Sequence, residues 1–170
     1  MKINNIKKYL GEYHVEGLLF NTIGPRAKKR LYLNFDEFYK ICMWKSPRPK
    51  KYYLSNKNTV RKITRKSFSL NDDLLKIKEL CKLNGIGMPT ASAILTVVFP
   101  DKFGIIDVRC LEELNNLGHK IKISMSPKTW LEYIEIIRSL AKENNVTPRE
   151  IDMVLFAMHR EKQGDKNLYN

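Results

Sequence analysis

Cysteine and histidine are scarce in this sequence of 170 residues, and neither is clustered. The three cysteines, Cys42, Cys81 and Cys110, lie far apart and form no Cys-x-x-Cys pair, and the three histidines are scattered as well. Structural zinc and iron–sulfur sites need ligands grouped at short spacings, so we expect no metal and no other cofactor. An odd number of separated cysteines favours reduced thiols and a cytoplasmic protein.

Long apolar segments are also missing. No run of about 18 apolar residues is present that could span a bilayer. The basic start of the chain, residues 1–6, lacks the apolar stretch and the cleavage site of a secretory signal. We therefore expect no membrane association. A hydrophobic content of 43% is sufficient for a compact core, and we expect a monomer.

Acidic residues are absent from one part of the chain. Between Glu37 and Asp72 there is no Asp or Glu, while ten Lys and Arg fall in the same interval. Residues 1–72 carry a net charge of +12, and residues 73–170 carry +1. Charge of one sign concentrated in this way attracts polyanions. A coding bias toward lysine is the alternative, but it would raise lysine in both halves and would not remove acids from one.

Apolar residues recur at helical spacing through most of the chain, and no strand pattern or internal repeat is visible. Asn34 followed by Glu37 predicts a capping box for a helix over 35–44, and Asn71 predicts the cap of a helix over 72–82. Further helical patterns cover residues 3–13 (Ile3, Ile6, Leu10 and Tyr13), 59–67 and 108–117, and two more begin after Ser126 and Thr147.

The helical patterns predict an all-α fold with two lobes around a helical hairpin. We expect one helical unit over residues 1–170. Its parts are a basic N-terminal lobe over 1–71, the hairpin over 72–98, and a loop with the C-terminal helices over 99–165.

Residues 44–53 differ from their surroundings because Pro47 and Pro49 are separated by one residue. This spacing excludes a helix, so we predict an extended basic loop. Aromatic rings between Lys and Arg suit stacking on an extruded or single-stranded base. The alternative is that Trp44 and one tyrosine complete the core while the lysines are solvated. The candidate DNA or base contacts here and in the next helical pattern are Trp44, Lys45, Arg48, Lys50, Lys51, Tyr52, Tyr53, Arg61 and Arg65.

The most specific segment is Leu83–Leu95, in which two glycines flank one apolar residue and a helical pattern begins at once. The glycines predict a tight turn, from which the free N–H groups and the positive dipole end of the next helix face outward. Such a turn can bind a phosphate diester without reading a base. A plain corner between two helices is the alternative. We expect backbone contacts at Gly85, Ile86, Gly87, Met88 and Thr90.

This hairpin and the segment after it resemble the helix-hairpin-helix DNA glycosylases of base-excision repair. In that family an apolar-apolar-Asp element follows the second helix of the hairpin. Ile105-Ile106-Asp107 stands here at the family's spacing, eighteen residues after Pro89. The resemblance covers residues 72–117 and extends more weakly to the C-terminus. It implies damaged double-stranded DNA as the partner and Asp107 as the catalytic residue.

The resemblance also implies a reaction. Members that cut the strand carry a hairpin lysine that forms a Schiff base with the sugar, whereas this chain has Pro89 there. It would therefore hydrolyse the N-glycosidic bond and leave the strand intact. A carboxylate suits this step because it stabilises positive charge on the sugar and can orient water. By position, Asp107 is also suited to cap a helix, and Arg109 to bind the DNA backbone or to form a surface salt bridge.

Three functions follow from these patterns. The leading one is a monofunctional DNA N-glycosylase that acts in the cytoplasm without a metal. The second is a non-catalytic helix-hairpin-helix protein with a reduced base pocket, which binds DNA or structured RNA. The third is a helical protein–protein module in which the hairpin serves only packing.

Overall fold

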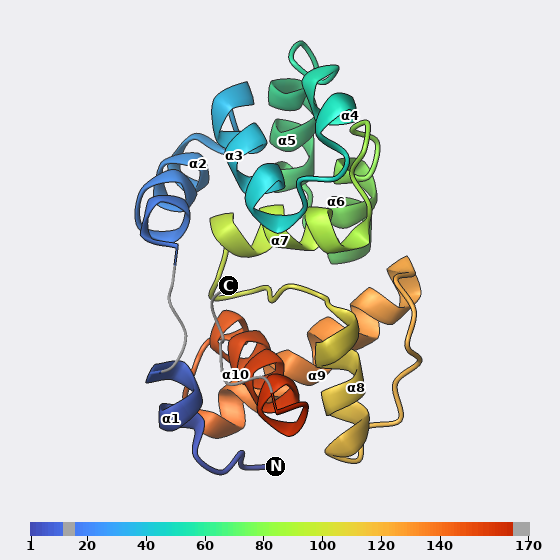
Figure 1. The fold of residues 1–170 in the computed structure, drawn as a ribbon. Helices are drawn as coiled ribbons and strands as arrows, with labels where there is room; N and C mark the ends of the chain where they lie inside the picture. Colours follow the sequence, from blue (N-terminus) through green and yellow to red (C-terminus); the bar gives the residue numbers. More distant parts are fainter. Residues whose placement is uncertain (12–15, 165–170) are drawn as a thin grey trace. The chain divides into compact units, whose positions relative to one another are not determined.

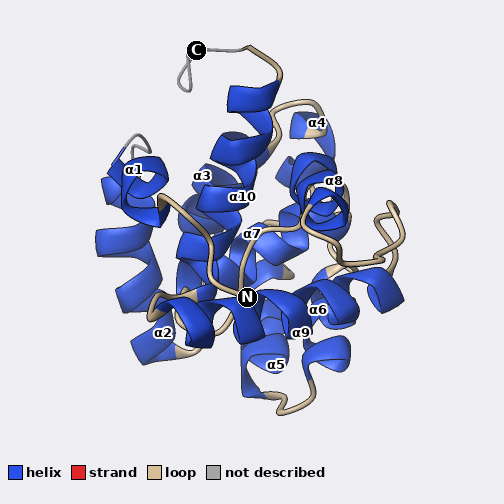
Figure 2. Cartoon of the chain, turned by 90° about the horizontal axis from the view of Figure 1, so that it is seen from below, coloured by secondary structure: helices blue, strands red, loops and turns tan. Residues whose placement is uncertain are grey.

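The computed structural model describes residues 1–11 and 16–164, and within these residues the regular elements are helices without any strand (Figure 2). The predicted all-α class is therefore confirmed. The chain divides into two compact units. Glu16–Phe99 form one, here called the hairpin unit, and Met1–Val15 with Pro100–Asn170 form the other, here called the Asp107 unit. Among the described helices, none has the length and apolar character needed to cross a membrane.

The hairpin unit is built around α7 (Met88–Val98), whose residues from Thr90 onward are all buried. This helix lies against four others of its unit, η1, α2, α3 and α6 (Figure 1). The elements that precede it are η1, a π-helix (Leu18–Ile23), and the α-helices α2 (Gly24–Arg30), α3 (Phe35–Lys45), α4 (Lys50–Leu54), α5 (Val60–Ser69) and α6 (Asp73–Leu80).

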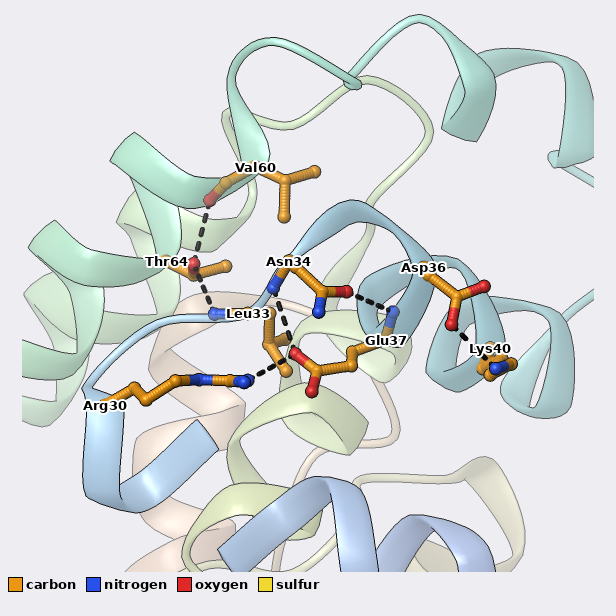
Figure 3. A network of polar contacts seen from close by, with 8 residues as sticks. All are labelled: Arg30, Leu33, Asn34, Asp36, Glu37, Lys40, Val60 and Thr64. Carbon is orange, nitrogen blue, oxygen red and sulfur yellow. Dashed lines mark hydrogen bonds and ion pairs between the residues drawn. The ribbon is translucent and has the colours of Figure 1, made fainter. Parts of the chain in front are cut away.

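The start of α3 follows the sequence prediction. The Glu37 N–H donates to Asn34 Oδ1 at 2.9 Å, and the Asn34 N–H donates to Glu37 Oε2 at 3.0 Å, which completes the capping box (Figure 3). Phe38, Ile41 and Cys42, which share one face of this helix, are fully buried. Two local signals, a cap and an apolar spacing of three and four residues, were sufficient to define this helix.

Two predictions about the hairpin unit were wrong in detail. Residues 50–53 are helical and belong to α4, because Pro49 occupies the N-cap position with a φ of −80°, where proline's fixed φ and missing N–H are tolerated. Only 46–49 remain outside a helix between α3 and α4. The cap of α6 is Asp72 and not Asn71, since Asp72 Oδ1 accepts the Leu75 N–H at 2.7 Å.

The Asp107 unit contains α1 (Ile6–Gly11), α8 (Val108–Asn116), α9 (Pro127–Asn144) and α10 (Pro148–Lys162). Within this unit α10 packs against the other three helices. The helices α9 and α10 begin after Ser126 and Thr147 as predicted, and these two residues cap them; Thr147 forms a capping box with Glu150. Tyr13, the last residue of the first helical pattern, lies outside the described residues.

Candidate nucleic-acid interface

The hairpin turn is formed by local backbone geometry. After α6, the Ile86 N–H donates to the Leu83 carbonyl at 3.1 Å, which closes the turn. Gly85 adopts a φ of +79°, and Gly87 is extended at φ −95° and serves as the N-cap of α7. Ile86 is only 6% exposed, as expected for a side chain that anchors the turn from inside. The segment therefore forms the tight turn and immediate helix that its sequence predicts.

Gly85 is required by the fold. Its positive φ belongs to the left-handed region, which side chains disfavour. A methyl group at this position would lie 2.7 Å from Cβ of Tyr52 and 3.2 Å from Cβ of Pro49. The turn therefore packs directly against the start of α4, and only glycine leaves room for that approach.

Gly87 is not required by the fold in the same way. Its φ and ψ are accessible to any residue, and a methyl group there would meet nothing closer than Cδ of Pro89 at 3.9 Å. The residue is also exposed. The bare backbone at Gly87 thus serves no packing purpose within the hairpin unit. A glycine at such a place allows another molecule to approach the backbone closely.

The first turn of α7 has no side-chain cap at its N-terminus. The first amide that bonds back within the helix is that of Ala91, which donates to the Gly87 carbonyl at 2.9 Å. The amides before it have no acceptor inside the helix, and Pro89 has no N–H at all. Met88 and Thr90 are only 7% and 5% exposed, so the accessible part of this helix end centres on Gly87.

Asn56 holds the hairpin turn in place from the residues after α4. Its side-chain Nδ2 donates to the Asn84 carbonyl at 2.9 Å, and its Oδ1 accepts the Asn84 N–H at 2.8 Å. The Asn84 side chain in turn donates to Ser55 Oγ at 3.0 Å. Asn56 is 1% exposed, so the amide that satisfies both backbone groups is itself buried. Sequence reasoning missed this residue because no local pattern relates positions 28 residues apart.

The aromatic residues of the basic segment separate into exposed and buried rings. Tyr52 is 64% exposed and its Cβ adjoins Gly85, so its ring is accessible beside the turn. Tyr53 is fully buried, donates its hydroxyl to the Ser46 carbonyl at 2.9 Å, and has its pKa raised by that burial. Its ring cannot stack on a base, which corrects that candidate. Trp44 is half-buried and packs edge-on against Phe20, with ring centroids 5.9 Å apart.

The basic candidates lie on three neighbouring elements of the hairpin unit. Lys45 is half-buried in the last turn of α3. Arg48, Lys50 and Lys51 are exposed at and just before the start of α4, the helix that packs on Gly85. Arg61 and Arg65 are exposed on α5. The structure therefore places the hairpin turn, Tyr52 and several exposed cations in one unit.

Asp107 belongs to the other unit and caps α8. Its Oδ1 accepts the Arg109 N–H at 3.1 Å, and the residue is half-buried. The two apolar residues before it, Ile105 and Ile106, are 5% and 0% exposed. They anchor the loop in the core, so that the chain emerges toward the surface at the aspartate. The capping role expected as an alternative is thus realised.

A buried polar group that sequence reasoning missed fixes this loop. Asp152 is 3% exposed, its Oδ2 accepts the Ile105 N–H at 2.8 Å, and its other oxygen pairs with Arg149. The Tyr133 hydroxyl donates to the Ile105 carbonyl at 3.0 Å, and burial raises the pKa of this tyrosine well above its usual value. The sequence does carry one signal for this contact. Asp152 interrupts the apolar residues of α10 and follows Arg149 by three positions, so the two side chains lie on the same face of the helix.

Arg109 follows Asp107 on the exposed side of α8. Its guanidinium group lies 5.1 Å from the ring centroid of Phe156, a contact that neither sequence alternative anticipated. The N–H donors of a guanidinium group lie in its plane and stay available when its face rests on a ring. Arg109 can therefore still donate to a phosphate.

No family model matches this chain, and no solved structure matches it either. Among the described residues, no three His, Cys, Asp or Glu side chains gather in a way that could hold a metal ion. The function is therefore inferred from the residues and their geometry.

Proposed function

We propose that this chain binds the sugar–phosphate backbone of double-stranded DNA through the hairpin turn and α4. The observation that carries the proposal is Gly87, an exposed glycine that the fold does not require, at the uncapped N-terminus of α7. Helix N-termini attract anions through free amides and the helix dipole. Arg48, Lys50 and Lys51 are exposed in the segment that packs on the turn, and no acid lies between Glu37 and Asp72 to offset them.

The reaction proposed for this protein is hydrolysis of the N-glycosidic bond of a damaged base. Its support is the resemblance to the helix-hairpin-helix DNA glycosylases, together with an Asp107 carboxylate at the end of a loop that Asp152 and Tyr133 hold from inside. A carboxylate so placed can stabilise positive charge on the sugar and orient water. Because Pro89 stands in the hairpin, the enzyme has no amine there for strand cleavage.

The second candidate is a non-catalytic protein that binds DNA or structured RNA. It is favoured by one observation, that Asp107 accepts the Arg109 N–H and so already has a structural task as the cap of α8. Both candidates share the backbone-binding surface of the hairpin unit. They differ only in whether a base is released.

Base release from damaged duplexes decides between the two candidates. The substrates are oligonucleotides with alkylated, deaminated and oxidised bases, heated in alkali afterwards to cut at abasic sites. The enzyme should produce abasic sites in at least one of them, without strand cleavage before alkali and without a borohydride-trapped adduct. Abasic sites in none of them would favour the non-catalytic binder.

Asp107→Asn tests the residue assigned to catalysis. Asparagine keeps the size of the side chain and most of its capping ability but removes the charge. Release of the base should fall by about 100-fold or more, while duplex affinity and melting temperature stay nearly unchanged. Asp101→Asn, an exposed aspartate in the preceding turn, is the matched control and should retain full activity. Full activity of Asp107→Asn would exclude this residue as the catalyst.

A further inference from the structure

Three arginines of the hairpin unit converge on one aromatic ring. The guanidinium carbons of Arg30, Arg61 and Arg65 lie 5.2, 4.6 and 4.8 Å from the ring centroid of Tyr32. Arg61 and Arg65 are exposed, and Tyr32 and Arg30 are half-buried. The cluster brings side chains from α2, from the linker between α2 and α3, and from α5 to one place on the surface.

The linker that carries Tyr32 is fixed against α5 by a buried hydroxyl. Thr64 Oγ1 accepts the Leu33 N–H at 3.0 Å and donates to the Val60 carbonyl at 2.8 Å (Figure 3). Leu33 and Thr64 are both fully buried. Since Tyr32 precedes Leu33, and Arg61 and Arg65 flank Thr64 on α5, this anchor positions the ring beside two successive turns of the helix.

The cluster has more positive charge than its surroundings neutralise. Arg30 pairs with Glu37, with 2.6 Å between Nη2 and Oε2, and this hydrogen bond raises the pKa of Arg30 (Figure 3). Within the described residues, no carboxylate forms a salt bridge with Arg61 or Arg65. Like charges four residues apart destabilise a helix, and these two side chains are held close to a third cation. An arrangement of three cations and one carboxylate can therefore accommodate a further anion.

The ring contacts leave the hydrogen-bond donors of the arginines available. A guanidinium group stacks on a ring through its face, while its N–H groups lie in its plane. With their guanidinium carbons 4.6 and 4.8 Å from the ring centroid, Arg61 and Arg65 can rest on Tyr32 in this way and keep N–H donors for a ligand. Guanidinium groups bind phosphate in pairs of parallel N–H···O bonds, so an ordered cluster of them suits an anion with several free oxygens.

We propose that Arg30, Arg61, Arg65 and Tyr32 form a phosphate-binding site, separate in its residues from the hairpin turn. The ligand is a phosphate group with at least two unesterified oxygens. It comes either from the backbone of the nucleic acid, in which case the site rests on the proposed DNA binding, or from a free phosphate. In the first case the hairpin unit binds DNA at two places, which fixes its orientation on the duplex.

The first experiment uses inorganic phosphate as the probe and needs no nucleic acid. The Nε–H resonances of the arginines are followed by NMR during a phosphate titration of the full chain, with ionic strength held constant by chloride. The signals of Arg61 and Arg65 should shift and saturate. Arg138, which also lies on a ring but donates its Nε–H to the Lys102 carbonyl, should not shift. Equal shifts at all arginines, or none, would overturn the site.

Variants of Tyr32 distinguish a built site from a general effect of charge. Tyr32→Leu leaves every charge in place but removes the ring that orders the arginines. It should weaken phosphate binding by about threefold or more. Without the ring, the arginine side chains lose their conformational freedom only when phosphate binds, and this loss opposes binding. Tyr32→Phe keeps the ring and should bind as the wild type does. Unchanged binding in a folded Tyr32→Leu variant would show that the ring builds no site.

Duplex DNA binding identifies the source of the phosphate. Removing both exposed arginines in R61A/R65A should lower the slope of log affinity against log salt by about 0.9 for each phosphate that the protein no longer neutralises. The control K57A/K62A removes two exposed lysines and changes the net charge equally. If the salt slope decreases more in R61A/R65A than in K57A/K62A, the site binds the DNA backbone. If the slope decreases equally in both variants while inorganic phosphate still shifts the Arg61 and Arg65 signals of the wild type, the site binds a free phosphate. Since the titration contains no DNA, it tests the site even if the hairpin turn binds none.

Discussion

The hairpin unit and the Asp107 unit are similar in size but differ in how their charges are used. Residues 16–99 hold 17 Lys and Arg against 6 Asp and Glu, a net charge of +11, while the remaining residues hold 14 against 12, or +2. In the Asp107 unit, cations pair across helices with carboxylates, as Lys162 does with Glu113 and Lys8 with Glu161. In the hairpin unit, exposed cations outnumber the carboxylates available to them.

Under the proposed function, this difference assigns the polyanion to the hairpin unit. A unit whose charges are paired internally gains little from an external anion, whereas an excess of +11 destabilises the compact state and is relieved by one. The Asp107 unit instead uses buried polar contacts around Asp152 to hold one loop in a fixed conformation. Under the proposed function, the hairpin unit binds the nucleic acid, and the carboxylate assigned to catalysis belongs to the Asp107 unit.

The strongest test of this comparison separates the two glycines of the hairpin turn. Gly85→Ala should destabilise the protein by about 1–3 kcal/mol, because its φ is +79° and a methyl group would lie 2.7 Å from Cβ of Tyr52. Gly87→Leu should leave the unfolding free energy within about 0.5 kcal/mol, since the site is open and exposed. It should nevertheless weaken duplex binding about tenfold by blocking the backbone.

The measurements are chemical denaturation and fluorescence anisotropy with a labelled duplex at fixed salt. Gly87→Ala serves as an intermediate control, with a side chain too short to fill the approach to the amides. Normal duplex binding by a folded Gly87→Leu variant would remove the hairpin turn from the proposed interface. The excess positive charge of the hairpin unit would then have to serve a purpose other than DNA binding at this turn.

A structural feature could be predicted from the sequence when the residues that determine it lie close together along the chain. The start of α3 at the cap Asn34 and the starts of α9 and α10 after Ser126 and Thr147 are correct because a cap depends on residues within one turn, whereas the cap of α6 is off by one residue, since Asn71 and Asp72 are both suitable caps. The hairpin was identified from a turn and a helix start that are adjacent in sequence. The helix α4 does not follow from the sequence pattern, because the two prolines disfavour a helix at and before their positions but allow one to begin directly after Pro49.

The remaining features depend on tertiary packing. Nothing in the sequence distinguishes Tyr52 from Tyr53, yet one is 64% exposed and the other fully buried, since packing on α3 and Gly85 decides which ring faces inward. The contact between Asn56 and Asn84 joins residues 28 positions apart. The anchoring of Tyr32 beside α5 depends on Thr64, and no local pattern relates the two. Long-range hydrogen bonds of this kind form only in the folded chain and leave no local pattern in the sequence.

Asn56 provides the next prediction, because it connects the basic segment to the hairpin turn. Asn56→Ala leaves the Asn84 N–H and carbonyl without their buried partners and should destabilise the protein by about 1–3 kcal/mol. Duplex affinity should fall as well, measured below the melting temperature of the variant, because the turn is no longer held. Asn58→Ala, an exposed neighbour, should change neither quantity. Loss of stability with full affinity would show that the turn needs no support from Asn56.

A smaller effect is expected from removing pairs of lysines in each unit. K50A/K51A should lower duplex affinity a few-fold and reduce the salt slope by about 0.9 for each phosphate left without its lysine. K120A/K122A removes two exposed lysines from the Asp107 unit and should leave the slope nearly unchanged. Both variants change the net charge equally, so affinity is compared across a salt series. The same decrease in both variants would mean that the total charge, and not its place in the hairpin unit, governs binding.

The smallest expected effect concerns two carboxylates and pH. Burial opposes ionisation of Glu79, but hydrogen bonds from Lys82 and Lys66 outweigh it, so the pKa of Glu79 lies below its ordinary value of 4.5. Hydrogen bonds from Lys8 and Tyr9 also lower the pKa of Glu161 in the other unit. A carboxyl with a depressed pKa stabilises the folded state at neutral pH, and this contribution is lost as pH falls from about 5 through the folded pKa.

The two carboxylates should differ because water screens one of them. The Glu79 side chain is 7% exposed, whereas that of Glu161 is 50% exposed. Glu79→Gln should therefore lower the unfolding free energy at pH 7 and flatten its decline between about pH 5 and pH 3. Glu161→Gln should change both only slightly, since exposed ion pairs contribute little. Urea denaturation across this pH range measures both variants, and an unaltered pH dependence in Glu79→Gln would show that this carboxyl does not hold α5 and α6 together.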